Sequence, residues 1–78
     1  NLVRADLSLA QMRGVNLAGA DLRKAYLAKA CLQGANLNWT ILEGADFSDA
    51  NLIEATLTGT DLADAIWTGT ILAEATQS

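Results

Sequence analysis

The sequence contains no histidine, no proline and a single cysteine, Cys31, among its 78 residues. A lone cysteine cannot form an internal disulfide or a cysteine-rich metal site, and no histidine is present to activate its thiol. We therefore expect Cys31, which takes an outward place beside Leu32, to be an inert surface residue. We also expect no metal and no cofactor.

Long apolar runs are missing as well. Charged residues are scattered at short intervals, so no segment approaches the length of a membrane span or the apolar stretch of a signal peptide. Aromatic residues make up only 5% of the chain, but apolar residues together make up 51%, too many for a disordered chain. We expect a folded, soluble chain without membrane contact, forming one small domain over residues 1–78.

A large apolar residue recurs every five residues, at positions 2, 7, 12 and onward. Twelve of the sixteen places in this central column hold Leu, Met12, Phe47 and Trp67 hold three more, and Gln77 is the exception. A second column, two places before each central residue, holds only Ala, Thr or Val. All six glycines lie two places after a central residue, where the lack of a Cβ permits unusual backbone angles.

A period of five suits neither an α-helix nor a flat strand. At about 100° per residue, successive leucines on a helix would step by about 140° and surround it instead of forming one stripe. On a strand with a side-chain period of two, alternate leucines would lie on opposite faces. A chain that turns at every repeat around a central axis places all of them inside. The pattern therefore predicts an all-β solenoid.

Runs such as Ala5-Asp6-Leu7-Ser8 and Asp49-Ala50-Asn51-Leu52 resemble the A-(D/N)-L-x-x signature of pentapeptide-repeat proteins. The phase is kept over some fifteen consecutive repeats, so the resemblance covers the entire chain. It implies a right-handed quadrilateral parallel β-helix with four pentapeptides per coil and about four coils here. A weaker twenty-residue echo agrees, because it would stack Leu2, Leu22, Leu42 and Leu62 in one column.

The predicted interior argues against catalysis. A solid core of Leu and Ala leaves no pocket in which reactive groups could converge, so we expect no enzyme. Asp46 and Asp49 flank Phe47 around one turn, and a carboxylate pair is the minimum for glycoside hydrolysis. Because nothing else in the sequence suggests a sugar site, we interpret these residues as solvated acids that keep the surface soluble.

Charge is divided between the two halves of the chain. Residues 1–39 hold all five basic side chains and two acids, whereas residues 40–78 hold seven acids and no base. Gyrase-protecting members of the family resemble duplex DNA in width and negative charge, so the resemblance offers a DNA-mimicking regulator of gyrase or another DNA-binding protein. Only half of this chain fits that pattern. We favour a non-enzymatic structural or protein-interaction module with an unidentified protein partner and no direct nucleic-acid binding.

Six apolar residues on outward or C-terminal places form the candidate interface: Trp39, Ile41, Ile66, Trp67, Ile71 and Leu72. The neighbours of Trp39 twenty residues away are Gly19 and Gly59, so its indole either anchors a partner or lies along its own wall. By resemblance we expect a homodimer built on the last four of the six residues, in the C-terminal coil. The rival is a cap from residues outside this chain.

The ends of the chain lack a recognisable cap. The repeats begin in phase at Asn1, without an initiator Met, and end in phase at Ser78. Bare end coils expose unpaired strand edges, so we expect either a piece of a longer chain or ends covered by another chain. Pentapeptide repeats are frequent in cyanobacterial proteins of several compartments, and among the cytoplasm, thylakoid lumen and periplasm we favour the cytoplasm.

Overall fold

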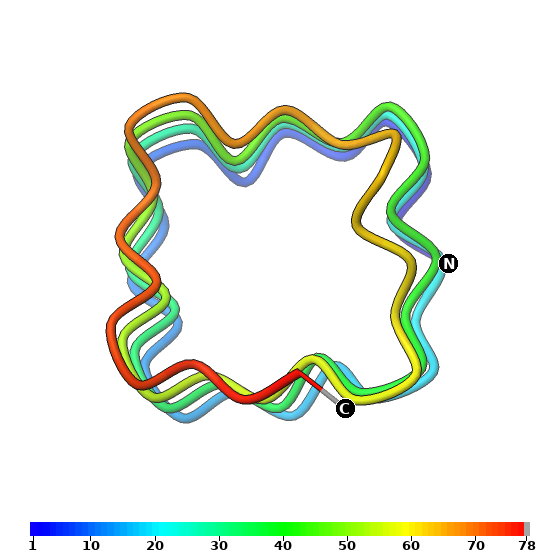
Figure 1. The fold of residues 1–78 in the computed structure, drawn as a ribbon. Coiled ribbons are helices and arrows are strands. Elements are labelled where there is room, and N and C mark those ends of the chain that lie inside the picture. The colour runs from blue at the N-terminus through cyan, green and yellow to red at the C-terminus, as the bar shows by residue number, and fades with distance from the viewer. Residues whose placement is uncertain (78) are drawn as a thin grey trace.

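The chain winds around a central axis as a square tube in the computed structural model, which describes residues 1–77 (Figure 1). We number four successive coils, formed by residues 1–20, 21–40, 41–60 and 61–77. Seen from the C-terminal end, the chain runs anticlockwise as it approaches the viewer, so the tube is right-handed (Figure 1). The predicted right-handed quadrilateral β-helix is confirmed, and the molecule extends 26, 23 and 21 Å along its principal axes.

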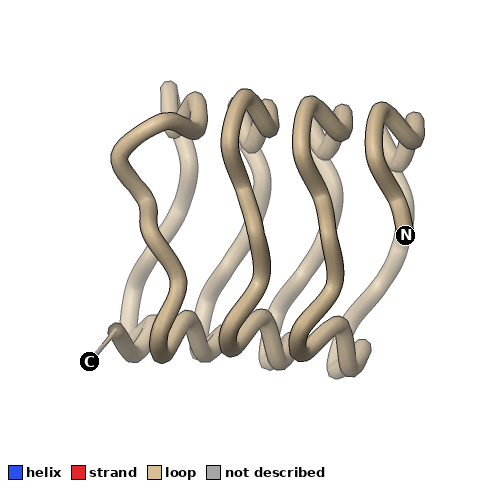
Figure 2. The backbone as a smooth tube through the Cα atoms, turned by 90° about the vertical axis from the view of Figure 1, so that its right-hand side faces the viewer, coloured by secondary structure: helices blue, strands red, loops and turns tan. Residues whose placement is uncertain are grey.

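Neighbouring coils pair through single parallel β-bridges between residues twenty apart, such as Asp6 with Tyr26 and Tyr26 with Asp46. At such a bridge Tyr26 N–H donates to Ala5 C=O at 2.8 Å, and Leu7 N–H donates to Tyr26 C=O at 2.7 Å. A turn follows each bridge, so within residues 1–77 the coils contain no helix and no strand longer than a bridge. The coils therefore stack as four separate rungs (Figure 2).

A repeated turn converts each pentapeptide into one side of the square. In the first coil Ala10 N–H donates to Leu7 C=O at 3.1 Å, and Leu9 between them has a φ of 64°. The same place holds Gly34, with a φ of 72°. Left-handed backbone costs a residue with a Cβ about 1–2 kcal/mol. This cost explains why all six glycines of the sequence stand at this place in the repeat.

The core fills the middle of the tube. In coils 2 and 3 the central and small-residue columns are buried: Leu22, Ala25, Leu27, Ala30, Leu32, Ala35, Leu37, Leu42, Ala45, Phe47, Ala50, Leu52, Ala55 and Leu57. Within residues 1–77, the central residues of coils 1 and 4 have a neighbouring coil on one side only. Leu2, Leu7 and Leu62 are therefore half-buried, and Leu72 is 40% exposed. Burial is thus complete only where a coil has a neighbour on both sides.

Threonine replaces alanine in the small-residue column without leaving an unpaired hydroxyl. The Oγ1 atoms of the buried Thr40 and Thr60 donate to Leu37 C=O at 2.9 and 2.8 Å. Thr70 Oγ1 likewise donates to Phe47 C=O at 2.7 Å. Because buried polar groups are costly unless they are hydrogen-bonded, these carbonyls make the substitution acceptable.

Candidate interaction surface

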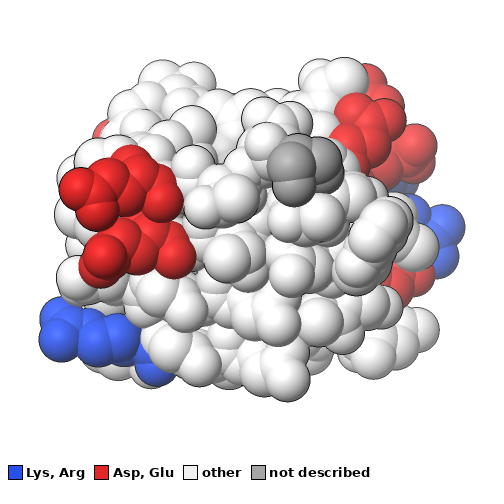
Figure 3. Space-filling view, turned by 60° about the horizontal axis from the view of Figure 1, so that its bottom comes forward, with Lys and Arg blue, Asp and Glu red and all other residues white. Residues whose placement is uncertain are grey.

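The four sides of the tube form four faces, A to D, from the successive pentapeptides of each coil. Face B consists of residues 6–10, 26–30, 46–50 and 66–70, and face C consists of residues 11–15, 31–35, 51–55 and 71–75. Face D consists of residues 16–20, 36–40, 56–60 and 76–77 and contains no charged residue. Figure 3 shows it as a white band with charged groups at its two edges. Its neighbour, face A, consists of residues 1–5, 21–25, 41–45 and 61–65 and carries both basic and acidic groups. Charge is therefore distributed around the tube as well as along it.

Side chains on face D bind one another. Thr56 Oγ1 donates to Asn36 Oδ1 at 3.3 Å, and the same Asn36 oxygen accepts from Asn38 N–H at 3.0 Å. One row further, Thr58 N–H donates to Asn38 Oδ1 at 2.9 Å. Amide and hydroxyl groups that are already paired hold face D as an ordered, uncharged surface.

Trp39 lies at the edge of face D and is 66% exposed. Its indole rests on the bare backbone of Gly59, because a Cβ built on that glycine would lie 2.1 Å from the indole Cε3. The other glycine of the predicted pair, Gly19, has nothing within 4 Å of a built Cβ. Ile41, two residues on at the start of face A, is 49% exposed. Trp39 and Ile41 thus contribute to one exposed apolar spot where faces D and A meet.

The ladder between coils 3 and 4 is interrupted on face A. All central residues from Leu2 to Leu57 except Leu42 donate their N–H to the next coil. Among residues 1–77 the N–H of Leu42 has no acceptor. The expected bridge between Ile41 and Asp61 is missing from the described chain, and Gly44 N–H pairs with Asp64 C=O at 2.9 Å. On this side coil 4 bends toward the tube axis (Figure 1) and leans away from coil 3 (Figure 2).

Trp67 accounts for the interruption. Its ring stacks on Phe47 in the interior, with centroids 4.7 Å apart and planes within 8°. Its Nε1–H donates to Leu62 C=O at 2.9 Å. In all the remaining repeats from Leu2 to Leu72, the C=O of the central residue accepts a hydrogen bond from the N–H three residues on, which closes the turn. Among residues 1–77 the corresponding bond from Ala65 N–H to Leu62 C=O is missing. The indole therefore takes the acceptor that would close the turn.

A groove of about 280 Å³ opens at this interruption. Its lining includes the exposed Trp39 and Ile41 and three acids, Glu43, Asp61 and Asp64. The lining contains no basic residue among the described part of the chain. The groove thus has both apolar side chains and negatively charged carboxylates in its lining.

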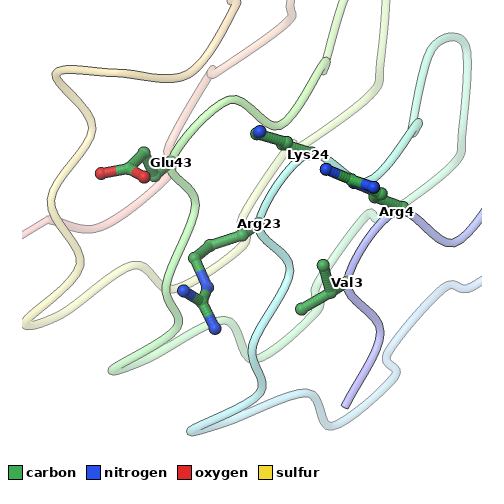
Figure 4. A pocket seen from close by; sticks show the side chains of 5 residues that line it. All are labelled: Val3, Arg4, Arg23, Lys24 and Glu43. Carbon is green, nitrogen blue, oxygen red and sulfur yellow. The ribbon is translucent and has the colours of Figure 1, made fainter.

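A second hollow, of about 300 Å³, lies on face A nearer the N-terminal coil, beside Arg4, Arg23, Lys24 and Glu43 (Figure 4). Figure 4 shows the Arg23 guanidinium turned away from Arg4 and Lys24. Arg23 instead forms an ion pair with Asp21, with Nη2 2.6 Å from Oδ2. This pair raises the pKa of Arg23 and lowers the pKa of Asp21. The basic groups do not converge, so the hollow has no built anion site.

The remaining candidate interface residues lie in coil 4. Ile66 and Ile71 point outward on two adjacent faces and are 47% and 49% exposed, whereas Trp67 is directed inward against Phe47. Leu72, which holds a place in the central column, is 40% exposed. The structure therefore places Trp39 and Ile41 together at the groove and the other four at the C-terminal end.

Aspartate and asparagine before the central residue have a structural role that the sequence analysis missed. Asp46 Oδ1 accepts from Ser48 N–H at 2.9 Å, and Asn51 Oδ1 accepts from Ile53 N–H at 3.0 Å. Hydrogen bonding to Ser48 lowers the pKa of Asp46. The signal was available, because Asn and Asp favour such local backbone bonds in turns. Asp49, the other member of the acid pair, lies instead over Gly69.

Among residues 1–77, no cluster of three or more Cys, Asp or Glu side chains is placed to bind a metal ion. No helix in the described part of the chain has the length and apolar character needed to span a membrane. Cys31 is half-buried within its row on the tube wall.

The stacked coils and their inward leucines define the class as a right-handed parallel β-helix. A family model described as pentapeptide repeats matches residues 1–28 and 30–69 in eight copies. The chain belongs to the pentapeptide-repeat family, as its signature predicts. No curated protein matches the chain.

Two solved structures illustrate the similarity. The pentapeptide repeat protein alr5209 from Nostoc PCC 7120 is 38% identical, with a TM-score of 0.54, and the match covers 87% of this chain and 60% of that one. Rfr23 from the cyanobacterium Cyanothece 51142 is 36% identical, with a TM-score of 0.59, and the match covers 94% of this chain and 50% of that one. The chain thus spans between half and three fifths of these relatives.

Proposed function

We propose that the chain is a non-enzymatic protein-interaction module that binds a protein partner at the corner between faces D and A. The observation that carries the proposal is the exposed pair Trp39 and Ile41 beside an uncharged face. Exposed tryptophan is a frequent hot spot in protein interfaces, because it buries a large rigid ring at low entropic cost. The rigid wall of the tube would present this anchor in a fixed position.

Face D supports the same proposal. A partner that covers it would desolvate no charge, and the bonds among Asn36, Asn38 and Thr56 are already formed before contact. Desolvation of unpaired polar groups and ordering of mobile side chains are major costs of association. Face D reduces both costs, which favours it as a docking surface for the region around Trp39.

Capture experiments with matched variants test the proposal. We expect Trp39→Ala with Ile41→Ser to reduce retention of the partner from the native lysate at least about tenfold, the effect of losing a hot spot. The control is Leu9→Ala, because Leu9 on face B is 67% exposed and also apolar. Equal loss in both variants, or no protein whose retention depends on Trp39, would reject the proposal.

A DNA-mimicking regulator is the second candidate, favoured by the seven acids and absent bases of residues 40–78. A mimic of duplex DNA must present its negative charge along a continuous surface, because DNA carries a charge about every 1.7 Å of axis. The uncharged face D divides the acids of this chain into separate groups, and we therefore rank the mimic second. Inhibition or protection of gyrase in a supercoiling assay would reverse that order.

A further inference from the structure

The interrupted ladder leaves a donor and an acceptor facing the groove between coils 3 and 4. At the next bridge along coil 4, Ile66 N–H donates to Ala45 C=O and Phe47 N–H donates to Ile66 C=O, both at 2.8 Å. The corresponding groups one side earlier are Thr40 C=O and Leu42 N–H. Neither has a backbone partner among residues 1–77. One residue of an extended chain, paired with Ile41 as a parallel bridge, would form hydrogen bonds with both Thr40 C=O and Leu42 N–H.

The lining of the groove restricts the chemistry of that extended chain. Trp39 and Ile41 offer apolar contact on one side of the open ladder position. Glu43, Asp61 and Asp64 place three carboxylates around the rest. An indole face and carboxylates both attract a cation, and carboxylates bind guanidinium groups with particular strength. The occupant with complementary charge is therefore a basic segment.

We propose that this groove binds an extended segment of a partner protein carrying arginine or lysine, with one residue added as a parallel bridge beside Ile41. The backbone of that residue accepts from Leu42 N–H and donates to Thr40 C=O. A neighbouring basic side chain reaches Glu43 and Asp64. Strand addition of this kind obtains affinity from main-chain bonds and specificity from side chains. The inference rests on the proposed interaction function and specifies the class of partner.

Titration of the 15N-labelled chain with defined peptides tests the inference. The probe is the blocked peptide acetyl-Ser-Val-Arg-Val-Arg-Ser-amide, and its control carries glutamate in both arginine positions. We expect the basic peptide to shift the amide signal of Leu42 and the indole N–H signal of Trp39, and the acidic peptide to shift neither. N-methylation of the amide that donates to Thr40 should weaken binding about tenfold, the cost of one lost hydrogen bond with its partner left unpaired.

Variants of the chain distinguish the groove from general attraction to an acidic surface. Glu43→Gln with Asp64→Asn should weaken binding of the basic peptide about tenfold, because two carboxylates of the groove are neutralised. Glu54→Gln with Glu74→Gln removes the same charge from face C of the same coils. This control pair should change the affinity by less than about twofold, because exposed charges beyond a Debye length of about 10 Å are largely screened at 0.1 M salt.

Several results would overturn the inference. An equal effect of the two variant pairs would show attraction by overall charge. If N-methylation of the peptide amides, one at a time, weakened binding at no position, the groove would hold a basic side chain without a main-chain bond. Stronger shifts of the Leu42 signal with cellohexaose than with the peptide would assign the groove to a carbohydrate. If the peptide fails while Trp39→Ala still releases a captured partner, the inference is wrong and the proposed function stands.

Discussion

At the scale of the residue, the place two residues after the central residue, here called the second turn position, decides how well a pentapeptide fits the square, because its backbone is left-handed. Most of these positions hold residues with a Cβ, including Trp39 and Glu54 with φ values of 62° and 61°. Each of these residues with a positive φ bears the free-energy cost of left-handed backbone, and each places a side chain at an edge of the tube. Glycine removes that cost, and at Gly59 it also makes room for the indole of Trp39.

Two glycine substitutions separate these roles. Gly34→Ala should lower the free energy of unfolding by about 1 kcal/mol, the cost of left-handed backbone alone, because nothing lies within 4 Å of a Cβ built there. Gly59→Ala should cost more, because its Cβ would meet the Trp39 ring at 2.1 Å. Urea unfolding measures both energies, and the indole N–H signal of Trp39 should move only in the second variant. Equal costs with an unmoved signal would contradict this account.

Also at this scale, the (D/N) position of the signature has a physical explanation. Oxygens of Asp6, Asn16 and Asp46 accept the backbone N–H two residues further on, so each of these side chains holds the start of the turn that follows it. Where Ile41 or Ile66 takes this place, no such acceptor exists and the side chain is exposed. The substitutions exchange a local turn bond for apolar surface.

At the scale of the element, one side of coil 4 departs from the pattern because a single indole competes for a carbonyl. Trp67 Nε1–H bonds to Leu62 C=O, and Asp64 is the one described residue at the second turn position outside the positive-φ set. The altered turn moves this side out of register with coil 3. The groove beside Trp39 is thus a consequence of a residue in the interior.

Trp67→Phe tests that mechanism. Phenylalanine keeps a ring to stack on Phe47 but removes the N–H, so Leu62 C=O is free to accept from Ala65 and the bridge between Ile41 and Asp61 can form. We expect hydrogen exchange at the amide of Leu42 to slow at least about tenfold, since a closed ladder bond protects the amide. Trp39→Phe is the control and should leave this rate unchanged. An unprotected Leu42 amide in Trp67→Phe would refute the mechanism.

At the scale of the whole molecule, the stack is electrically and structurally uneven. Coils 3 and 4 carry seven acids and no base, whereas all five basic residues lie in coils 1 and 2. The central residues are fully buried only in coils 2 and 3, so the ends of the tube present partly apolar surfaces. The exposed Ile66, Ile71 and Leu72 give coil 4 apolar surface, and we propose a second copy of the chain as the partner that packs on it.

The predicted homodimer is tested by mass in solution. Ile66→Asp with Ile71→Asp places two charges at the expected contact, so the mass should fall from that of a dimer to that of the 8.2 kDa monomer. Burying unpaired charge in an interface is strongly unfavourable, which is the reason for this expectation. Val3→Asp on the N-terminal coil is the control and should keep the dimer. A wild-type chain that is already monomeric would exclude the dimer.

The five-residue spacing of apolar and small residues determined the coil and its core columns. The family resemblance implied the right hand of the coil, and the positions of the charged residues determined the division of charge along the axis. The coil and its core columns depend on a pattern that repeats, so no single contact had to be known. The interrupted ladder could not be predicted, because the spacing at Asp61 to Ala65 is regular and the sequence does not say which acceptor the Trp67 N–H finds. Only the tertiary structure decided this, since stacking on Phe47 brings that N–H to the Leu62 carbonyl.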